Sequence, residues 1–258
     1  MSGTLRAELR KTTTTRMWWV LLICVVVLSG GYAAAVALLQ PDAGAPFDDP
    51  GILRSIYNGG NPVTRVLALM LGITTIGAEY RHQTLAATYL ATPRRTRVLL
   101  SKAGSLLLFG LLYGVAAVAA GVAVSAPFVV SNNGSFFLDR GDTWRSLLLG
   151  AGSLALWTML GMGIGILIKN MLVAMLVGIT FAYLVEPILT LICYLQDWDL
   201  ALNLLPTGAT NAMLGITSLV LFASDDPLPW WQGLLLLAAW CLVPAVIGVL
   251  STVRRDVS

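Results

Sequence analysis

Charged residues are scarce in this sequence, and several residue types on which catalytic and metal sites depend are scarcer still. Only 11% of the 258 residues are charged, against about 25% in a typical soluble protein. The single histidine, His82, excludes a zinc site with a histidine pair and argues against a Ser-His-Asp hydrolase. The three cysteines lack metal-ligand spacing, and the chain contains no G-x-x-x-x-G-K-[ST] phosphate loop. We therefore expect no catalytic residues, no metal site and no nucleotide hydrolysis in this chain.

Apolar residues are abundant instead. They make up 57% of the sequence, and the mean hydropathy of +0.80 predicts an integral membrane protein. The sixteen basic residues are spread among apolar runs and form no continuous basic face, so the net charge of +3 does not predict nucleic-acid binding. Arginine outnumbers lysine in a chain rich in Ala, Gly, Val and Leu. This composition indicates a GC-rich bacterial genome and hence a multi-pass protein of the bacterial plasma membrane, the cell inner membrane.

A helix needs about 20 consecutive apolar residues to cross the hydrocarbon core of a bilayer. Six apolar runs bounded by charges, proline or asparagine reach or approach this length, at residues 17–39, 63–78, 104–124, 146–168, 171–193 and 231–250. The second run is short, so we expect it to begin before Pro62 or to continue past Glu79. The sequence thus predicts a single all-α transmembrane domain over residues 1–258, with six transmembrane helices.

The basic residues predict the direction of these helices. If the N-terminus is cytoplasmic, only Arg54, Arg65, Arg140 and Arg145 fall outside, which is the positive-inside pattern. The basic residues then on the cytoplasmic side are Arg6, Arg10, Lys11, Arg16, Arg81, Arg94, Arg95, Arg97, Lys102, Lys169, Arg254 and Arg255. The aspartates between the spans all fall outside. We therefore predict that both termini are cytoplasmic.

Two further segments depart from a scheme of spans and short loops. In residues 1–16, Leu5 and Leu9 share one helical face and Arg6 and Arg10 another, which predicts an interfacial helix under the inner leaflet. Residues 200–222 are moderately apolar but are interrupted by Asn, Pro and Gly. A seventh span there would place the C-terminus outside, so we expect a re-entrant or interfacial external helix before span 6.

Glycine spacing predicts close contacts between the transmembrane helices. Gly161 with Gly165, and Gly110 with Gly114, are four residues apart and so share a helical face. Small residues at this spacing allow two membrane helices to approach closely.

Glu186 is the only carboxylate deep in a predicted span, and Pro187 follows it and removes a backbone hydrogen bond. An ionisable group within the membrane is a candidate functional residue. Two interpretations remain open. Glu186 and Pro187 line a translocation path, or the carboxylate lies near the external end of its helix and reaches interfacial water.

Residues 77–102 are the most informative stretch, and they read G-A-E-Y-R-H-Q-T-L-A-A-T-Y-L-A-T-P-R-R-T-R-V-L-L-S-K. The stretch begins at the inner end of the second span and predicts a helix with a polar start and an apolar side made by Leu85, Tyr89 and Leu90. Pro93 ends that helix, and a basic turn then leads into the third span. A basic loop held by anionic lipid would explain the arginines but not the apolar side.

The stretch resembles the ABC transporter permeases of the type-2 exporter family, which share an acidic-aromatic-arginine start, a threonine and a later TP-R-R…K between spans 2 and 3. The resemblance extends to six spans, internal termini and the L-P-T-G-A-T-N-A-M-L-G of residues 205–215. It implies that residues 79–102 contain a cytoplasmic coupling helix that docks on a separate ATPase. The implied docking residues are Glu79, Tyr80, Arg81, His82, Thr84 and Leu85, while Arg94, Arg95, Arg97 and Lys102 would set the position of the helix on the membrane. Gln83 departs from the family, which often has glycine there.

The resemblance also implies a function and partners. The chain would be the permease of an ATP-driven exporter of a drug, antibiotic, peptide, lipid or glycan. Two permeases, identical or different, would pair with two ATPases, and ATP and Mg²⁺ would bind to the ATPases, so this chain needs no cofactor. Membrane lipid is a further expected partner. The alternative is an ion-coupled secondary transporter that uses Glu186, although the internal repeats common in such carriers are not evident in the sequence.

Overall fold

The computed structural model describes residues 2–39, 49–58, 62–81, 95–131, 134–216 and 226–255. Every regular element in these ranges is a helix, and six helical segments are long and apolar enough to cross a membrane. The predicted all-α chain with six candidate spans is therefore confirmed. The elements are α1 (Ser2–Thr14), α2 (Met17–Leu39), α3 (Pro50–Tyr57), α4 (Pro62–Arg81), α6 (Arg95–Ser131), α7 (Gly141–Leu167), α8 (Met171–Thr180), η1 (Phe181–Val185), α9 (Glu186–Leu195), α10 (Asp199–Leu204), α11 (Pro206–Leu214) and α12 (Trp230–Arg255).

Two helices differ in extent from the apolar runs that predicted them. Helix α4 continues past Glu79 to Arg81, which confirms one of the two expected extensions of the second run. Helix α6 has 37 residues, far more than the predicted 104–124. At about 1.5 Å per residue it is about 55 Å long, whereas the hydrocarbon core is about 30 Å thick. Hydropathy marks only the part of the helix that crosses the core.

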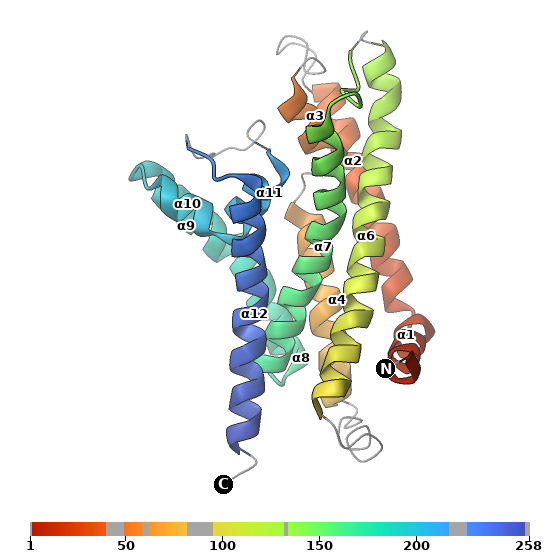
Figure 1. Ribbon diagram of the computed structural model, residues 1–258, viewed down its shortest axis with the longest axis vertical. Helices are drawn as coiled ribbons and strands as arrows, with labels where there is room; N and C mark the ends of the chain where they lie inside the picture. The colour runs from red at the N-terminus through yellow and green to blue at the C-terminus, as the bar shows by residue number, and fades with distance from the viewer. Residues whose placement is uncertain are drawn as a thin grey trace.

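Both termini lie at one end of the bundle, together with α1, the last turn of α4 and the first turn of α6 (Figure 1). We call this the terminal end. Helices α3, α10 and α11 lie toward the opposite end. Helix α7 occupies the centre and packs against α4, α6 and α12. The side chains of Trp157 on α7 and Tyr113 on α6 are fully buried there.

Glycines bring the central helices close together. A Cβ atom added at Gly161 on α7 would lie 2.0 Å from the carbonyl oxygen of Leu69 on α4. A Cβ atom at Gly114 on α6 would lie 2.1 Å from the carbonyl oxygen of Ala151 on α7. Backbone fills the space that a side chain would need at both positions. The predicted close approach at these glycines is thus confirmed.

Residues 200–222 contain no helix long enough to span a membrane in the part that the structure describes. Helices α10 and α11 have 6 and 9 residues, and they meet at Leu205. Helix α11 packs against α7 and α12, and the indole Nε1 of Trp157 donates a hydrogen bond to Thr210 Oγ1 at 3.1 Å. Gly215, with φ of +65°, ends α11 in the left-handed conformation that glycine adopts readily. Helix α11 thus forms part of the bundle wall, whereas α10 lies beside α9.

The fifth candidate span is the least enclosed. It is made by α8, the π-helical turn η1 and α9, and only 17% of its most apolar window is buried, against 61% for α7. Helix α9 extends away from the bundle beside α10 (Figure 1). Pro187 stands in the first turn of α9, where its missing N–H interrupts the helical hydrogen-bond pattern next to η1.

Candidate functional site

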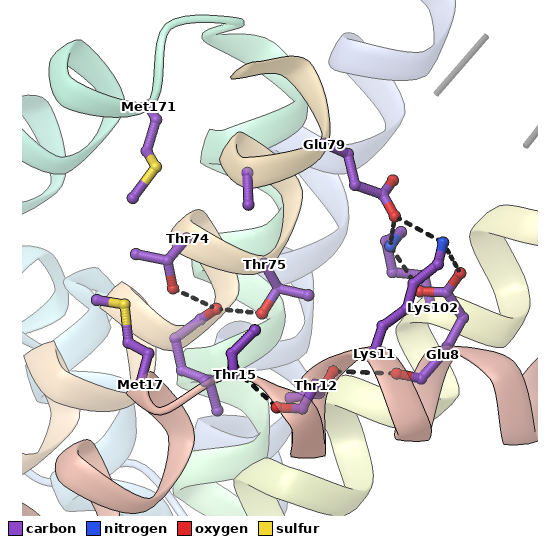
Figure 2. Close-up of a pocket in the computed structure, with 12 residues that line it drawn as sticks. Glu8, Lys11, Thr12, Thr15, Met17, Thr74, Thr75, Glu79, Lys102 and Met171 are labelled. Atoms are coloured by element: carbon purple, nitrogen blue, oxygen red, sulfur yellow. Dashed lines mark hydrogen bonds and ion pairs between the residues drawn. The ribbon is translucent and has the colours of Figure 1, made fainter. Parts of the chain in front are cut away.

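Four charged side chains from three helices meet at the terminal end (Figure 2). The Lys102 Nζ atom on α6 lies 2.7 Å from Glu8 Oε2 on α1 and 2.7 Å from Glu79 Oε1 on α4. The Lys11 Nζ atom on α1 lies 3.1 Å from Glu8 Oε1 and 3.3 Å from Glu79 Oε1. We call these four residues the ion-pair cluster. Each carboxylate contacts both ammonium groups, so the cluster joins α1, α4 and α6.

Most of the ion-pair cluster is buried. Lys102 is 1% exposed, Glu8 4% and Glu79 7%, whereas the Lys11 side chain is 48% exposed. Burial of single charges is strongly unfavourable, but two carboxylates and two ammonium groups have no net charge and satisfy one another. The Oε2 atom of Glu79 is buried without a hydrogen-bond partner in the described part of the chain. The three buried members therefore depend on one another more than on the partly exposed Lys11.

The ion-pair cluster determines which face of α1 packs against the bundle. Glu8 and Thr12 are buried against the bundle, and Arg6 and Arg10 are exposed on the other side of the helix. The sequence predicted a helix here with an outward basic face, but it did not single out Glu8 or Lys11. A signal was available, because Glu8 is the only acidic residue among the first forty and precedes Lys11 by one helical turn.

The pKa values of the α1 residues predict a pH dependence of its docking. Burial raises the pKa of Glu8, but Lys102 and then Lys11 outweigh that effect and hold the pKa below 4.5. Burial lowers the pKa of Lys11, but Glu8 and Glu79 outweigh it and raise the pKa above 10.5. Glu8 therefore stabilises docking above its unfolded pKa and ceases to do so as pH falls through its folded pKa. Lys11 contributes below 10.5 and ceases to do so as pH rises through its folded pKa.

We expect α1 to stay docked at neutral pH and to separate from α4 and α6 in acid, below about pH 4.5. The measurement is the emission of a fluorophore attached at Arg6→Cys, followed throughout the pH titration. In Glu8→Gln the acid transition should disappear. An unchanged transition in that variant would show that another group controls docking.

The predicted docking and membrane-surface residues lie in different surroundings. Glu79 and Lys102 lie in the ion-pair cluster, and both side chains are buried there. Tyr80 and Arg81 form the last turn of α4. Arg95 and Arg97 belong to the first turn of α6, but their side chains are outside the description. His82, Thr84, Leu85 and Arg94 lie outside the described residues.

A cavity of about 400 Å³ adjoins the ion-pair cluster. Its walls combine the apolar side chains of Met17, Leu71 and Met171 with threonines of α1 and α4. Figure 2 shows Met17 and Met171 beside these threonines. The hydroxyls of Thr74 and Thr75 donate to backbone carbonyls of their own helix. The cavity thus offers an apolar space with a charged edge.

Glu186 lies inside the protein and is 3% exposed. Its Oε1 atom accepts a hydrogen bond of 2.6 Å from the backbone N–H of Thr207, in the first turn of α11. That helix has no cap from its own preceding residue, Leu205, so Glu186 caps it from another element. The structure therefore does not support the interpretation in which the carboxylate reaches interfacial water.

Arg65, which the sequence placed only as an external basic residue, belongs to the surroundings of Glu186. It is 6% exposed, and its Nη2 atom donates a hydrogen bond of 2.9 Å to Asn211 Oδ1 on α11. The charges of Arg65 and Glu186 also attract each other. Helix α11 is thus bound by Glu186 of the fifth span and by Arg65 of α4.

Comparison of the chain with protein-family models and with curated proteins finds no match to either. Fold and composition nevertheless define a class. Six apolar helices of sufficient length, with exposed tryptophans such as Trp19 at one end and Trp144 and Trp230 toward the other, are typical of a multi-pass membrane protein with aromatic residues at both interfaces. Within the described residues, no three His, Cys, Asp or Glu side chains converge on a possible metal site.

Proposed function

We propose that this chain is the permease subunit of an ATP-driven exporter that moves a hydrophobic or amphipathic substrate outward across a bacterial plasma membrane. The observation that supports this most is the ion-pair cluster. Glu79 lies two residues before the end of α4, and Lys102 lies two turns into α6. The cluster therefore ties together the two helices from which the connection over residues 82–94 starts and ends.

This arrangement suits a connection that transmits force. A partner that displaces the connection would displace α4 and α6 together, because Lys102 and Glu79 are in direct contact. Glu8 would carry the same movement into α1. Helix α4 packs along α7, so the displacement would reach the centre of the bundle. In this proposal Glu79 and Lys102 position the docking element, and the docking contacts themselves come from His82, Thr84 and Leu85, with Tyr80 and Arg81 at its base.

The partners follow from the same proposal. A dimer of ATPases, which binds ATP and Mg²⁺, docks on two permeases, and the substrate passes between or through the permeases when ATP closes the ATPases. The second permease is a copy of this chain or a related one. The substrate class is that of the resemblance: a drug, antibiotic, peptide, lipid or glycan.

Co-purification of the tagged chain with the ABC ATPases of its host tests the proposal. We expect His82→Ala combined with Leu85→Asp to reduce ATPase binding about tenfold or more, because contacts at the centre of an interface dominate its affinity. Arg6→Ala combined with Arg10→Ala is the matched control, since both arginines are exposed at the same end on α1. Equal binding by the docking variant and the wild type would contradict the proposed docking element. Failure of any ATPase to bind the wild-type chain would contradict the proposed function.

The alternative function is an ion-coupled secondary transporter that uses Glu186. A buried carboxylate beside the π-helical turn η1 favours it, since such turns often occur at functional sites. Against it, the Thr207 N–H holds the carboxylate in a fixed structural role as the cap of α11. Efflux that stops with an uncoupler but continues when ATP is depleted would favour the transporter over the exporter.

A further inference from the structure

A second cavity, of about 550 Å³, lies between the last turn of α4 and the turn from α7 to α8. Arg81 and Lys169 line it from these two elements, and Asn170, Met171 and Leu172 line it from the start of α8. We call it the α4–α8 cleft. Both elements belong to the terminal end of the bundle (Figure 1). The cleft is separate from the ion-pair cluster, although Met171 contributes to both cavities.

The α4–α8 cleft is positively charged. Neither Arg81 nor Lys169 forms an ion pair within the part of the chain that the structure describes, and no carboxylate lines the cleft. Lys11 and Lys102, at the same end, each contact two glutamates. Asn170 adds no free carboxamide oxygen, because its Oδ1 accepts hydrogen bonds from the first N–H groups of α8. The cleft therefore suits an anion.

The charged and the apolar residues of the cleft lie at different depths along the bundle. On α4, Gly77 lies one turn before Arg81, and on the other side Leu172 lies about one turn after Lys169. Because α4 runs toward the terminal end and α8 runs away from it, the cations lie at the end of the bundle and the apolar residues lie deeper. Leu172 is 75% exposed, so the deeper part of the cleft opens onto the outer surface of the bundle.

We propose that the α4–α8 cleft binds the headgroup of an anionic phospholipid, with the phosphate between Arg81 and Lys169 and the upper acyl chain along Met171 and Leu172. Guanidinium and ammonium groups are the usual protein partners of phosphate. A cavity of this volume is in the range of small-molecule sites. An acidic segment of a protein partner would use the cations but leave the exposed apolar part uncovered, which favours the lipid.

Native mass spectrometry of the delipidated full chain, titrated with phosphatidylglycerol or with phosphatidylcholine and without any ATPase, tests this proposal. The variant is Arg81→Gln combined with Lys169→Gln. Arg6→Gln combined with Arg10→Gln is the control, because it removes the same charge from exposed positions at the same end. We expect tight binding of phosphatidylglycerol by the wild type and the control, and about 30-fold weaker binding by the cleft variant. Phosphatidylcholine should bind all three weakly.

Several results would overturn the proposal. Equal phosphatidylglycerol binding by the cleft variant and the control would show that the cleft does not select the lipid. Displacement of the lipid by millimolar inorganic phosphate would show that the site recognises a free anion and that the acyl chain adds nothing. If the cleft variant binds lipid normally but loses the ATPase, the cleft is a protein-docking surface. Because the lipid assay contains no ATPase, it can succeed or fail independently of the proposed exporter function.

Discussion

Replacement of Lys102 by methionine is expected to lower the free energy of unfolding by about 3–5 kcal/mol. Lys102 is 1% exposed, and its ammonium lies 2.7 Å from a carboxylate oxygen of both Glu8 and Glu79. Without it, two buried carboxylates would share Lys11, whose side chain is half exposed and more distant from both. Methionine keeps the length of the side chain, so the loss reports the charge rather than packing. Denaturant unfolding of the detergent-solubilised chain measures it.

Lys11→Met is the matched control for this prediction. It removes the same chemical group from the same cluster, but a partly exposed ion pair contributes about 1 kcal/mol or less. Glu79→Gln combined with Lys102→Met should recover part of the stability, because one carboxylate then no longer needs a buried cation. Equal losses for Lys102→Met and Lys11→Met would show that burial does not determine the strength of these ion pairs.

The Lys102 result also bears on the proposed mechanism. A cluster that stabilises the fold by several kcal/mol holds α1, α4 and α6 as one unit on the time scale of transport. A weak cluster would let the connection over residues 82–94 move without moving the helices. Transport and ATPase binding are measured with Lys102→Met at a temperature where the variant remains folded. If the cluster couples the helices, the variant should lose substrate transport while it still binds the ATPase.

The architecture could be predicted from the sequence because lipid imposes a simple rule on the chain. All six apolar runs correspond to candidate spans, since a membrane helix needs apolar side chains over a fixed length. Helix α3 was not predicted, although Asp49 followed by Pro50 is a readable helix start. The Asp49 Oδ1 atom accepts a hydrogen bond of 2.7 Å from the N–H of Gly51. Helix α3 is too short to be recognised as an apolar run that could cross a membrane.

The contacts of the candidate sites were beyond the reach of sequence patterns. Glu79 and Lys102 were both singled out, but as surface residues of one connection rather than as a buried pair. Their pairing depends on how α4 and α6 pack, and no spacing rule links residues separated by a connection. The same holds for Glu186, whose carboxylate caps α11. Its partner could be named only once the position of α11 beside the fifth span was known.

Glycine spacing, by contrast, predicted a tertiary contact, and it supports the second large effect. Gly161→Ala is expected to destabilise the protein by about 2–3 kcal/mol. The added methyl group would lie 2.0 Å from the Leu69 carbonyl oxygen and 2.8 Å from its carbonyl carbon. These are backbone atoms of a buried helix and cannot rotate away, so α4 and α7 must separate along their whole contact. Thermal unfolding in detergent measures the loss.

Gly152→Ala is the control, because Gly152 lies on the same helix α7 and a Cβ atom there would meet nothing within 4 Å. Alanine stabilises a helix relative to glycine by up to about 1 kcal/mol, so this variant should be as stable as the wild type or slightly more stable. The two substitutions make the same chemical change in one helix and differ only in what faces them. Opposite signs would show that the separation of α4 and α7 is set by backbone contact at Gly161. Similar small effects of the two substitutions would mean that α4 and α7 can move apart at little cost in free energy. A displacement of α4 would then not be passed on to α7, which would contradict the proposed mechanism.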